Sequence, residues 1–116
     1  MTRVMFDSNA LDAALRSGDA ARILASGITV AITTAQEDEF HQIADATKRQ
    51  ALFDLLYALK AERMAPVDLP WDASADAAIA ATAAKTCDLL VSDDKGIAHK
   101  NLRVLSYSDF RKAYLP

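Results

Sequence analysis

The sequence predicts an α/β fold with a mainly parallel central sheet and helices on both of its faces. Short apolar runs, typical of buried strands, alternate with longer segments that carry apolar residues at helical spacing. The alternation continues along the whole chain without a repeat, a linker or a low-complexity tract. It is typical of parallel sheets, because each crossover between parallel strands needs a helix that packs on a face of the sheet. We therefore expect residues 1–116 to form a single domain.

The individual elements follow from local patterns. Leu11 and Leu15 lie at helical spacing after the first apolar run, and Gly18 is expected to end that helix. Asp19 is a plausible N-cap for a second short helix, which Gly27 would end. The expected strands cover residues 3–6, 28–32, 63–67, 88–92 and 102–106. The further helices are expected over residues 33–44, 46–62, 72–85 and 106–114.

Composition excludes several classes of protein. About half of the residues are apolar and 25% are charged, as in ordinary soluble domains. No apolar run approaches the roughly 18 residues of a membrane span, and the first residues do not resemble a signal peptide. The single cysteine, Cys87, cannot form an internal disulfide, which favours the cytoplasm. A net charge of −3 neither indicates nor excludes nucleic-acid binding, because a metal-dependent nuclease carries acids in its site.

Carboxylates follow two of the predicted strands at the point where each strand ends. The stretch "VMFDSN" ends on Asp7, and "LLVSDD" ends on Asp93 and Asp94. Taken singly, each aspartate is best explained as a cap of the following helix. Parallel strands, however, bring their carboxyl ends to the same edge of the sheet, where sites of this fold class lie. Acids after two strands therefore indicate a candidate site.

A third carboxylate comes from "TTAQEDEF". Thr34 and Glu37 have the spacing of a capping box, which gives Glu37 a structural role. Glu39 lies four residues after Ala35 and four before Ile43, so helical spacing predicts that it lies on the apolar face. An exposed glutamate at the edge of that face is the alternative.

A fourth carboxylate, Asp76, lies in the alanine-rich segment "ADAAIAATAAK". Ile79 and Ala80 lie on the same side of the expected helix, which turns Asp76 toward the sheet. The alternative is a first-turn acid that complements the helix dipole, with Asp72 or Ser74 as the N-cap. An alanine-rich helix has no sharply defined face, so the spacing leaves both interpretations open.

Four inward-facing acids would repel one another unless a cation neutralised them. Ligands that are all oxygen atoms select hard ions such as Mg²⁺ or Mn²⁺. Sites of this kind act mostly on phosphates, because the metal joins acid oxygens to phosphate oxygens and activates water.

Four stretches, "VMFDSNALD", "TTAQEDEF", "DAAIAATA" and "LLVSDDKG", resemble in this order the motifs of PIN domains. The similarity is greatest to the VapC-type toxins of bacterial toxin–antitoxin pairs, and it extends from Arg3 to the last strand. "DAAIAATA" is the most specific of the four motifs. The resemblance implies a PIN-like domain that cleaves single-stranded RNA, including tRNA or rRNA loops, with Mg²⁺ or Mn²⁺. It also implies a homodimer that a cognate antitoxin inhibits.

The resemblance also implies roles for individual residues. It assigns the catalytic metal site to four acids, which are Asp7, Glu39, Asp76 and Asp94. Asn9 and Ser92 match positions where the family has polar residues that support the site. Asp93 is then a turn residue or a neighbour that adds negative potential, and Lys95 is a candidate RNA contact. The chain is short between residues 61 and 71, where many members insert helices, which puts the substrate groove and the dimer in question.

Three other functions remain open at this stage. A response-regulator receiver domain would suit the length, but it needs a phosphoacceptor aspartate after the middle strand, and none is convincing. A PIN fold kept only for binding would not need all four acids. A DNA nuclease with the same site is the third, because residues at the metal do not read the sugar.

Overall fold

The computed structural model describes residues 2–69, 74–94, 96–97 and 99–116. These residues form a sheet of five strands in the order β3-β2-β1-β4-β5, with every neighbouring pair parallel. The predicted α/β class is therefore confirmed, and the described sheet is wholly parallel. The strands are β1 (Arg3–Phe6), β2 (Thr29–Thr33), β3 (Glu62–Met64), β4 (Leu89–Val91) and β5 (Arg103–Leu105).

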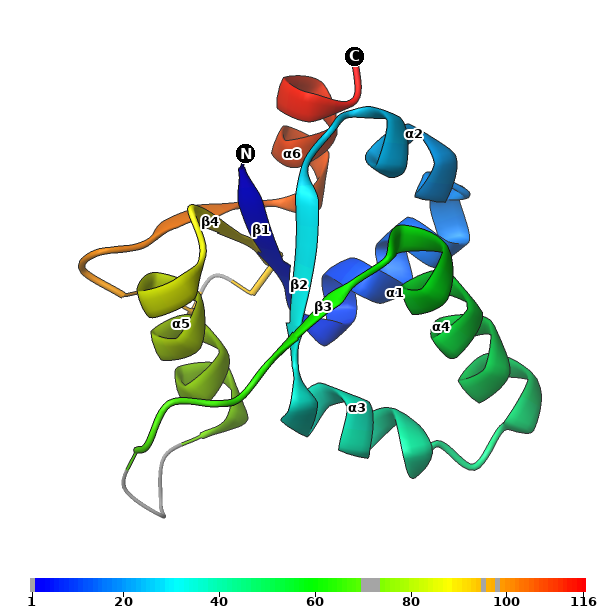
Figure 1. Ribbon diagram of the computed structural model, residues 1–116, viewed down its shortest axis with the longest axis horizontal. Helices are drawn as coiled ribbons and strands as arrows, with labels where there is room; N and C mark the ends of the chain where they lie inside the picture. Colours follow the sequence, from blue (N-terminus) through cyan, green and yellow to red (C-terminus); the bar gives the residue numbers. More distant parts are fainter. Residues whose placement is uncertain (1, 70–73, 95, 98) are drawn as a thin grey trace.

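Helices cover both faces of the sheet, as predicted. Figure 1 shows α5 on one side of the sheet and α1, α2 and α4 on the other. Within the described ranges, none of the helices is long and apolar enough to cross a membrane. The helices are α1 (Ser8–Ser17), α2 (Ala20–Ala25), α3 (Thr34–His41), α4 (Ala46–Leu59), α5 (Ala75–Thr86) and α6 (Tyr107–Tyr114).

The sheet separates two apolar cores, because successive side chains of a strand point to opposite faces. In β1, Val4 and Phe6 belong to the larger core, which α1, α2, α4 and α6 complete. Met5 faces the smaller core under α5, together with Ile79 and Ala80. Both faces of the central strands are thus buried, which explains why their sequences are continuous apolar runs rather than alternating ones.

The first turn of α3 is capped one residue earlier than the sequence predicted. Thr33, not Thr34, is the N-cap, and it forms a capping box with Gln36. The predicted partner Glu37 instead forms an ion pair with Arg63 of β3, with 2.7 Å between Nε and Oε1. The capping-box prediction was therefore wrong by one residue, because two adjacent threonines each fit the first position of the motif.

Asp19 precedes α2 as predicted, but its carboxylate does not cap that helix. It is 2% exposed, and it accepts a hydrogen bond of 2.7 Å from the Tyr107 hydroxyl. Arg111 lies 3.0 Å from the same carboxylate. Burial, followed by the bond to Asp19, raises the pKa of the Tyr107 phenol. Asp19 therefore joins α2 to α6, a contact between distant segments that local sequence patterns do not reveal.

Candidate functional site

The order of the strands creates a switch point between β1 and β4. The chain adds β2 and β3 on one side of β1 and places β4 and β5 on the other side. In open parallel sheets, ligands bind beyond the carboxyl ends of the strands at such a point. β1 ends directly before Asp7, and β4 ends directly before Ser92. The predicted acids therefore follow the two strands that flank the switch point.

Asp7 lies at the centre of this edge and is only 4% exposed. Its Oδ1 caps α1 by accepting a hydrogen bond of 2.7 Å from the amide of Ala10. Its Oδ2 accepts a hydrogen bond of 2.5 Å from the hydroxyl of Ser92. Burial raises the pKa of Asp7, the two hydrogen bonds oppose this, and the charges of Asp93 and Asp94 add to the rise. A cation at this edge would favour the ionised form of Asp7.

Ser92 connects the first predicted acid to the last. It is buried, donates its hydroxyl proton to Asp7, and accepts a hydrogen bond of 3.1 Å from the amide of Asp94. The hydroxyl thereby fixes both the carboxylate at the end of β1 and the turn after β4. This arrangement agrees with the supporting position that the resemblance gives to Ser92.

Asp94 and Asp76 are in direct contact although they are 18 positions apart in the sequence. A hydrogen bond between the two carboxyl groups is the main cause that raises the pKa of Asp76, and the charges of Asp94, Asp7 and Glu39 add to it. Two carboxyl groups in contact must share a proton or a cation. The contact therefore marks a place that favours positive charge.

Asp76 itself lies in the first turn of α5, whose N-cap is Ser74. The hydroxyl of Ser74 accepts a hydrogen bond of 3.0 Å from the amide of Ala77. Asp76 is exposed rather than turned toward the sheet, while Ile79 and Ala80 face the core. The alternative N-cap, Asp72, lies outside the described residues.

Asp93 differs from its neighbour Asp94. Its Oδ1 accepts a hydrogen bond of 2.8 Å from the amide of Tyr107, the first residue of α6. A carboxylate in this position satisfies an amide that the helix leaves unpaired and complements the helix dipole. Asp93 thus has a structural task, and its charge raises the pKa of Asp7.

Glu39 does not lie on the apolar face of α3, so that prediction was wrong. The residues of this helix that face the core are Gln36 and Phe40, whereas Ala35 and Glu39 are exposed. Glu39 lines a cavity between α1, α3 and α4, together with Asn9. In the described part of the chain, Asn9 makes no hydrogen bond to Asp7, whose partners are Ser92 and Ala10.

Gln36 is a residue of this edge that the sequence analysis missed. Its side chain is fully buried, and its Nε2 donates a hydrogen bond of 2.9 Å to the carbonyl of Phe6. Its Oε1 accepts a hydrogen bond of 2.8 Å from the amide of Thr33. The amide group therefore holds the start of α3 against the end of β1, directly before Asp7. The signal for it was the Thr33–Gln36 spacing, which also fits a capping box.

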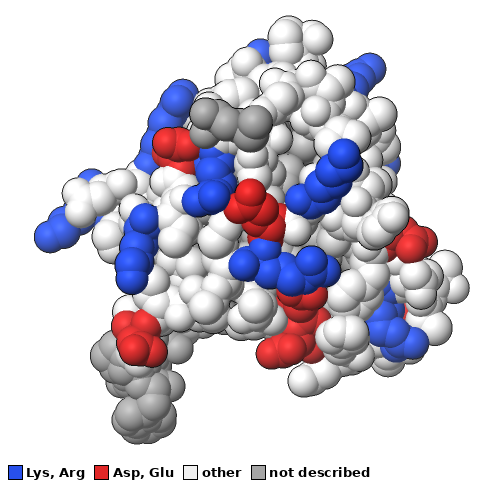
Figure 2. Space-filling model, viewed as in Figure 1, with Lys and Arg blue, Asp and Glu red and all other residues white. Residues whose placement is uncertain are grey.

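Positive charge also lies close to the acids of α3. Figure 2 shows acidic side chains over the position of α3 and Lys and Arg side chains directly above them. Arg63 reaches from β3 to Glu37 in the first turn of α3. Lys95, the predicted RNA contact, lies outside the described residues.

Oxygen ligands at this edge fit a hard divalent ion by their chemistry, because they are carboxylates with one hydroxyl between them. Their present spacing is not that of a complete ligand shell. Among the described residues, no three Asp, Glu, His or Cys side chains gather closely enough to hold one ion. A cation bound by both Asp76 and Asp94 would take the place of the proton that their contact shares.

Compared with family models and with curated proteins, the chain matches none.

Asp76→Asn is expected to stabilise the metal-free protein at neutral pH. The pKa of Asp76 is raised above its ordinary 3.8, so the folded state binds more protons than the unfolded state just above pH 3.8. The free energy of unfolding therefore falls as the pH rises from 3.8 through the raised pKa. The variant removes this fall, with a gain below about 1 kcal/mol because solvent screens the exposed group. Thermal unfolding between pH 4 and pH 8 measures it, with EDTA present.

Mn²⁺ should reverse the effect, because a bound cation stabilises the ionised acids of the wild-type protein. The melting temperature of the wild type is expected to rise with Mn²⁺, and that of Asp76→Asn to rise less. Asp109→Asn, in the first turn of α6, is the matched control, since it removes the same charge from another helix. If Mn²⁺ raised the melting temperature of both variants equally, Asp76 would not be a residue that binds Mn²⁺.

Proposed function

We propose that this chain is a Mg²⁺- or Mn²⁺-dependent endoribonuclease of the PIN-domain type that cleaves single-stranded RNA in the cytoplasm. The observation that carries the proposal is that Asp7 and Asp94 follow β1 and β4 at one edge of the sheet, where Asp94 is in contact with Asp76. Burial raises the pKa of Asp7, and the hydrogen bond to Asp94 raises the pKa of Asp76. The charges of the neighbouring acids add to both rises, and a divalent cation would relieve that repulsion. The motif resemblance supports the same assignment.

The residues of the edge have different tasks in this proposal. Asp7 is the central ligand, because two hydrogen bonds hold its carboxylate at the end of the central strand β1. Asp94 and Asp76 bind after they lose the shared proton, and Glu39 contributes from α3. Ser92 holds the carboxylate of Asp7 next to the turn after β4, because its hydroxyl bonds to both. A divalent ion at this site activates water and stabilises the charge that develops on phosphate oxygens.

The order of the strands argues against the response-regulator alternative. Receiver domains have the doubly wound order 2-1-3-4-5. The described sheet has the order β3-β2-β1-β4-β5. In addition, β3 ends on Met64, so no aspartate follows it directly.

A PIN-like fold used only for binding is the second candidate. It is favoured by the absence, among the described residues, of three side chains close enough to share an ion. Calorimetry with Mn²⁺ separates the two candidates. Stoichiometric Mn²⁺ binding that Asp94→Asn abolishes supports the nuclease, and no detectable binding supports the binding module.

We also propose the assembly that the resemblance implies, a homodimer inhibited by a cognate antitoxin. Tyr57 supports a protein contact, because it is 89% exposed beside a cavity lined by Phe53 and Leu56. Large aromatic side chains that are this exposed are typical of interfaces. The tRNA or rRNA target follows from the resemblance alone.

RNA cleavage with and without EDTA tests the proposed function. The purified chain is incubated with about 5 mM Mn²⁺, which would occupy a site with a dissociation constant of about 1 mM. The substrates are single-stranded RNA, duplex RNA and single-stranded DNA of the same sequence. Cleavage of the single-stranded RNA alone, lost in EDTA, is the expected result. Cleavage of DNA at the same rate would favour the DNA-nuclease alternative, and cleavage that persists in EDTA would contradict the metal mechanism.

A further inference from the structure

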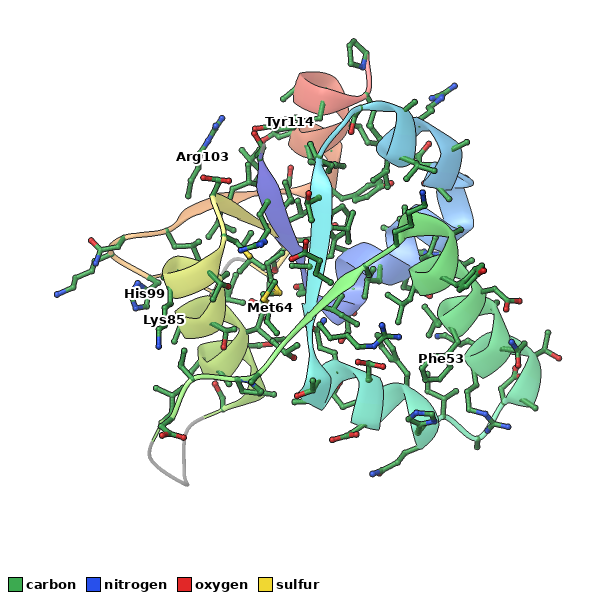
Figure 3. All side chains as sticks on the ribbon, in the orientation of Figure 1. Phe53, Met64, Lys85, His99, Arg103 and Tyr114 are labelled. Carbon is green, nitrogen blue, oxygen red and sulfur yellow. The ribbon has the colours of Figure 1, made fainter. Side chains whose placement is uncertain are left out.

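A cavity lies beside the acidic edge, the part of the sheet beyond β1 and β4 where Asp7, Asp76 and Asp94 are found. The cavity has the features of a small ligand site. It has a volume of about 280 Å³ and lies between α1, α3 and α4. Its base is apolar, formed by the buried side chains of Phe40 and Leu52 and the half-buried Ile43. The ring of Phe53, which Figure 3 shows between α3 and α4, meets Phe40 edge to face at 6.3 Å. Phe53 therefore packs against one of the side chains that form the base of the cavity.

The rim of the cavity is polar. Asn9 and Asp12 of α1 and Lys48 of α4 all line it. Lys48 lies 3.7 Å from the carboxylate of Asp12, which Arg16 also contacts at 3.2 Å from outside the cavity lining. An apolar base with a few polar groups at its rim is the usual composition of a small-molecule site.

Its position links this cavity to the acidic edge. Asn9 lies two residues after Asp7 in the sequence, and Glu39, whose charge raises the pKa of Asp76, also lines the cavity. The cavity therefore adjoins the acids along α1, which Asp7 caps, and along α3, which carries Glu39. We infer that the cavity binds a nucleobase of the RNA and so contributes base preference to the proposed cleavage. The inference rests on the proposed function.

The chemistry of the rim indicates which bases fit. The volume of about 280 Å³ lies at the lower end of the sizes typical of small-ligand sites, which is large enough for one nucleobase. The carboxylate of Asp12 accepts hydrogen bonds and matches the exocyclic amino group of adenine, cytosine or guanine. Uracil presents a carbonyl oxygen in place of that group, which a carboxylate repels. Lys48 would exchange its contact with Asp12 for the phosphate of the same nucleotide, which leaves the Asp12 carboxylate to the base.

Binding of nucleoside monophosphates tests this inference separately from cleavage. AMP, CMP, GMP and UMP are titrated in EDTA into the ¹⁵N-labelled chain, and amide chemical shifts are followed by NMR. We expect the amides around Phe40, Ile43 and Lys48 to shift, with dissociation constants on the order of 1 mM. UMP should bind roughly fivefold more weakly than CMP, the effect of one lost hydrogen bond.

Two pairs of variants connect the binding to the cavity. Ile43→Trp fills the cavity and should abolish the shifts, whereas Leu24→Trp adds the same ring at an exposed position of α2 and should leave them unchanged. Lys48→Ala should weaken binding severalfold. Arg16→Ala is its control, because it removes the same charge from Asp12 outside the cavity. Circular dichroism shows that each variant is folded.

The possible outcomes distinguish this inference from the proposed function. Nucleotide binding that Ile43→Trp removes, in a chain that cleaves no RNA, supports the cavity as a base site and contradicts only the nuclease. RNA cleavage with unchanged rate and base preference in Ile43→Trp contradicts only the base site. Shifts confined to the residues around Asp76 and Asp94, or an equal effect of Leu24→Trp, would also overturn the inference.

Discussion

Asp7→Asn is expected to reduce RNA cleavage by at least about 100-fold and to leave the fold intact, because it removes the charge of the proposed metal ligand. The substitution keeps the size of the side chain, and the amide oxygen can still accept the hydrogen bond from Ala10 that caps α1. The amide nitrogen can donate to the hydroxyl of Ser92. Initial rates with Mn²⁺ measure the loss, and circular dichroism measures the fold.

Ser92→Ala provides a control that keeps the carboxylate. The hydrogen bond from Ser92 lowers the pKa of Asp7, so its removal should raise that pKa further. Activity should then fall less than in Asp7→Asn, and the rising limb of the pH–rate profile should move to higher pH. Full activity of Asp7→Asn at every pH would mean that the carboxylate of Asp7 has no part in the chemistry.

The arrangement of Asp7 and Asp94 could be predicted from the sequence because two simple rules apply to it. Continuous apolar runs such as "VMF" and "LLV" indicate strands that are buried on both faces, which favours a parallel sheet. Parallel strands all end at the same edge, so residues that follow them lie near one another. Neither rule requires knowledge of a contact between distant segments.

The orientation of α3 was not predictable in the same way. Spacing arguments placed Glu39 on the buried face because Ala35 and Ile43 lie on its side of the helix. Alanine is a weak marker of burial, and the face that is actually buried carries Gln36. A polar amide is buried there because the carbonyl of Phe6 and the amide of Thr33 satisfy it. Those partners are set by tertiary structure, which hydrophobic periodicity does not include.

Spacing also could not distinguish Asp93 from Asp94. The difference depends on α6, because the amide that Asp93 caps belongs to Tyr107, 14 residues further along the chain. Asp94 is then the residue left to contact Asp76. Asp76 belongs to α5, which covers the face of the sheet opposite to α6. The motif resemblance selected Asp94 from the sequence, and the hydrogen bonds of the two aspartates provide an independent physical reason for the same choice.

Asp94→Asn is therefore expected to be severe and Asp93→Asn mild. In Asp94→Asn, the neutral amide at the contact with Asp76 weakens metal binding, and cleavage should fall by at least about 100-fold. In Asp93→Asn, the side-chain oxygen can still accept the hydrogen bond from Tyr107. The lost charge at the N-terminus of α6 should cost about 0.5 kcal/mol of stability, and activity should fall less than about fivefold.

The two variants remove the same charge from adjacent positions, so each serves as the control of the other. A general loss of negative potential at the edge would lower the activity of both equally. A metal-ligand role for Asp94 lowers cleavage and Mn²⁺ affinity together, whereas a structural role for Asp93 lowers the melting temperature first. Asp93→Ala sharpens this distinction, because it removes the acceptor of the Tyr107 amide and should cost about 1 kcal/mol. If Asp93→Asn were the severe variant, Asp93 rather than Asp94 would be the ligand, and the hydrogen bond to Tyr107 would have to break when metal binds.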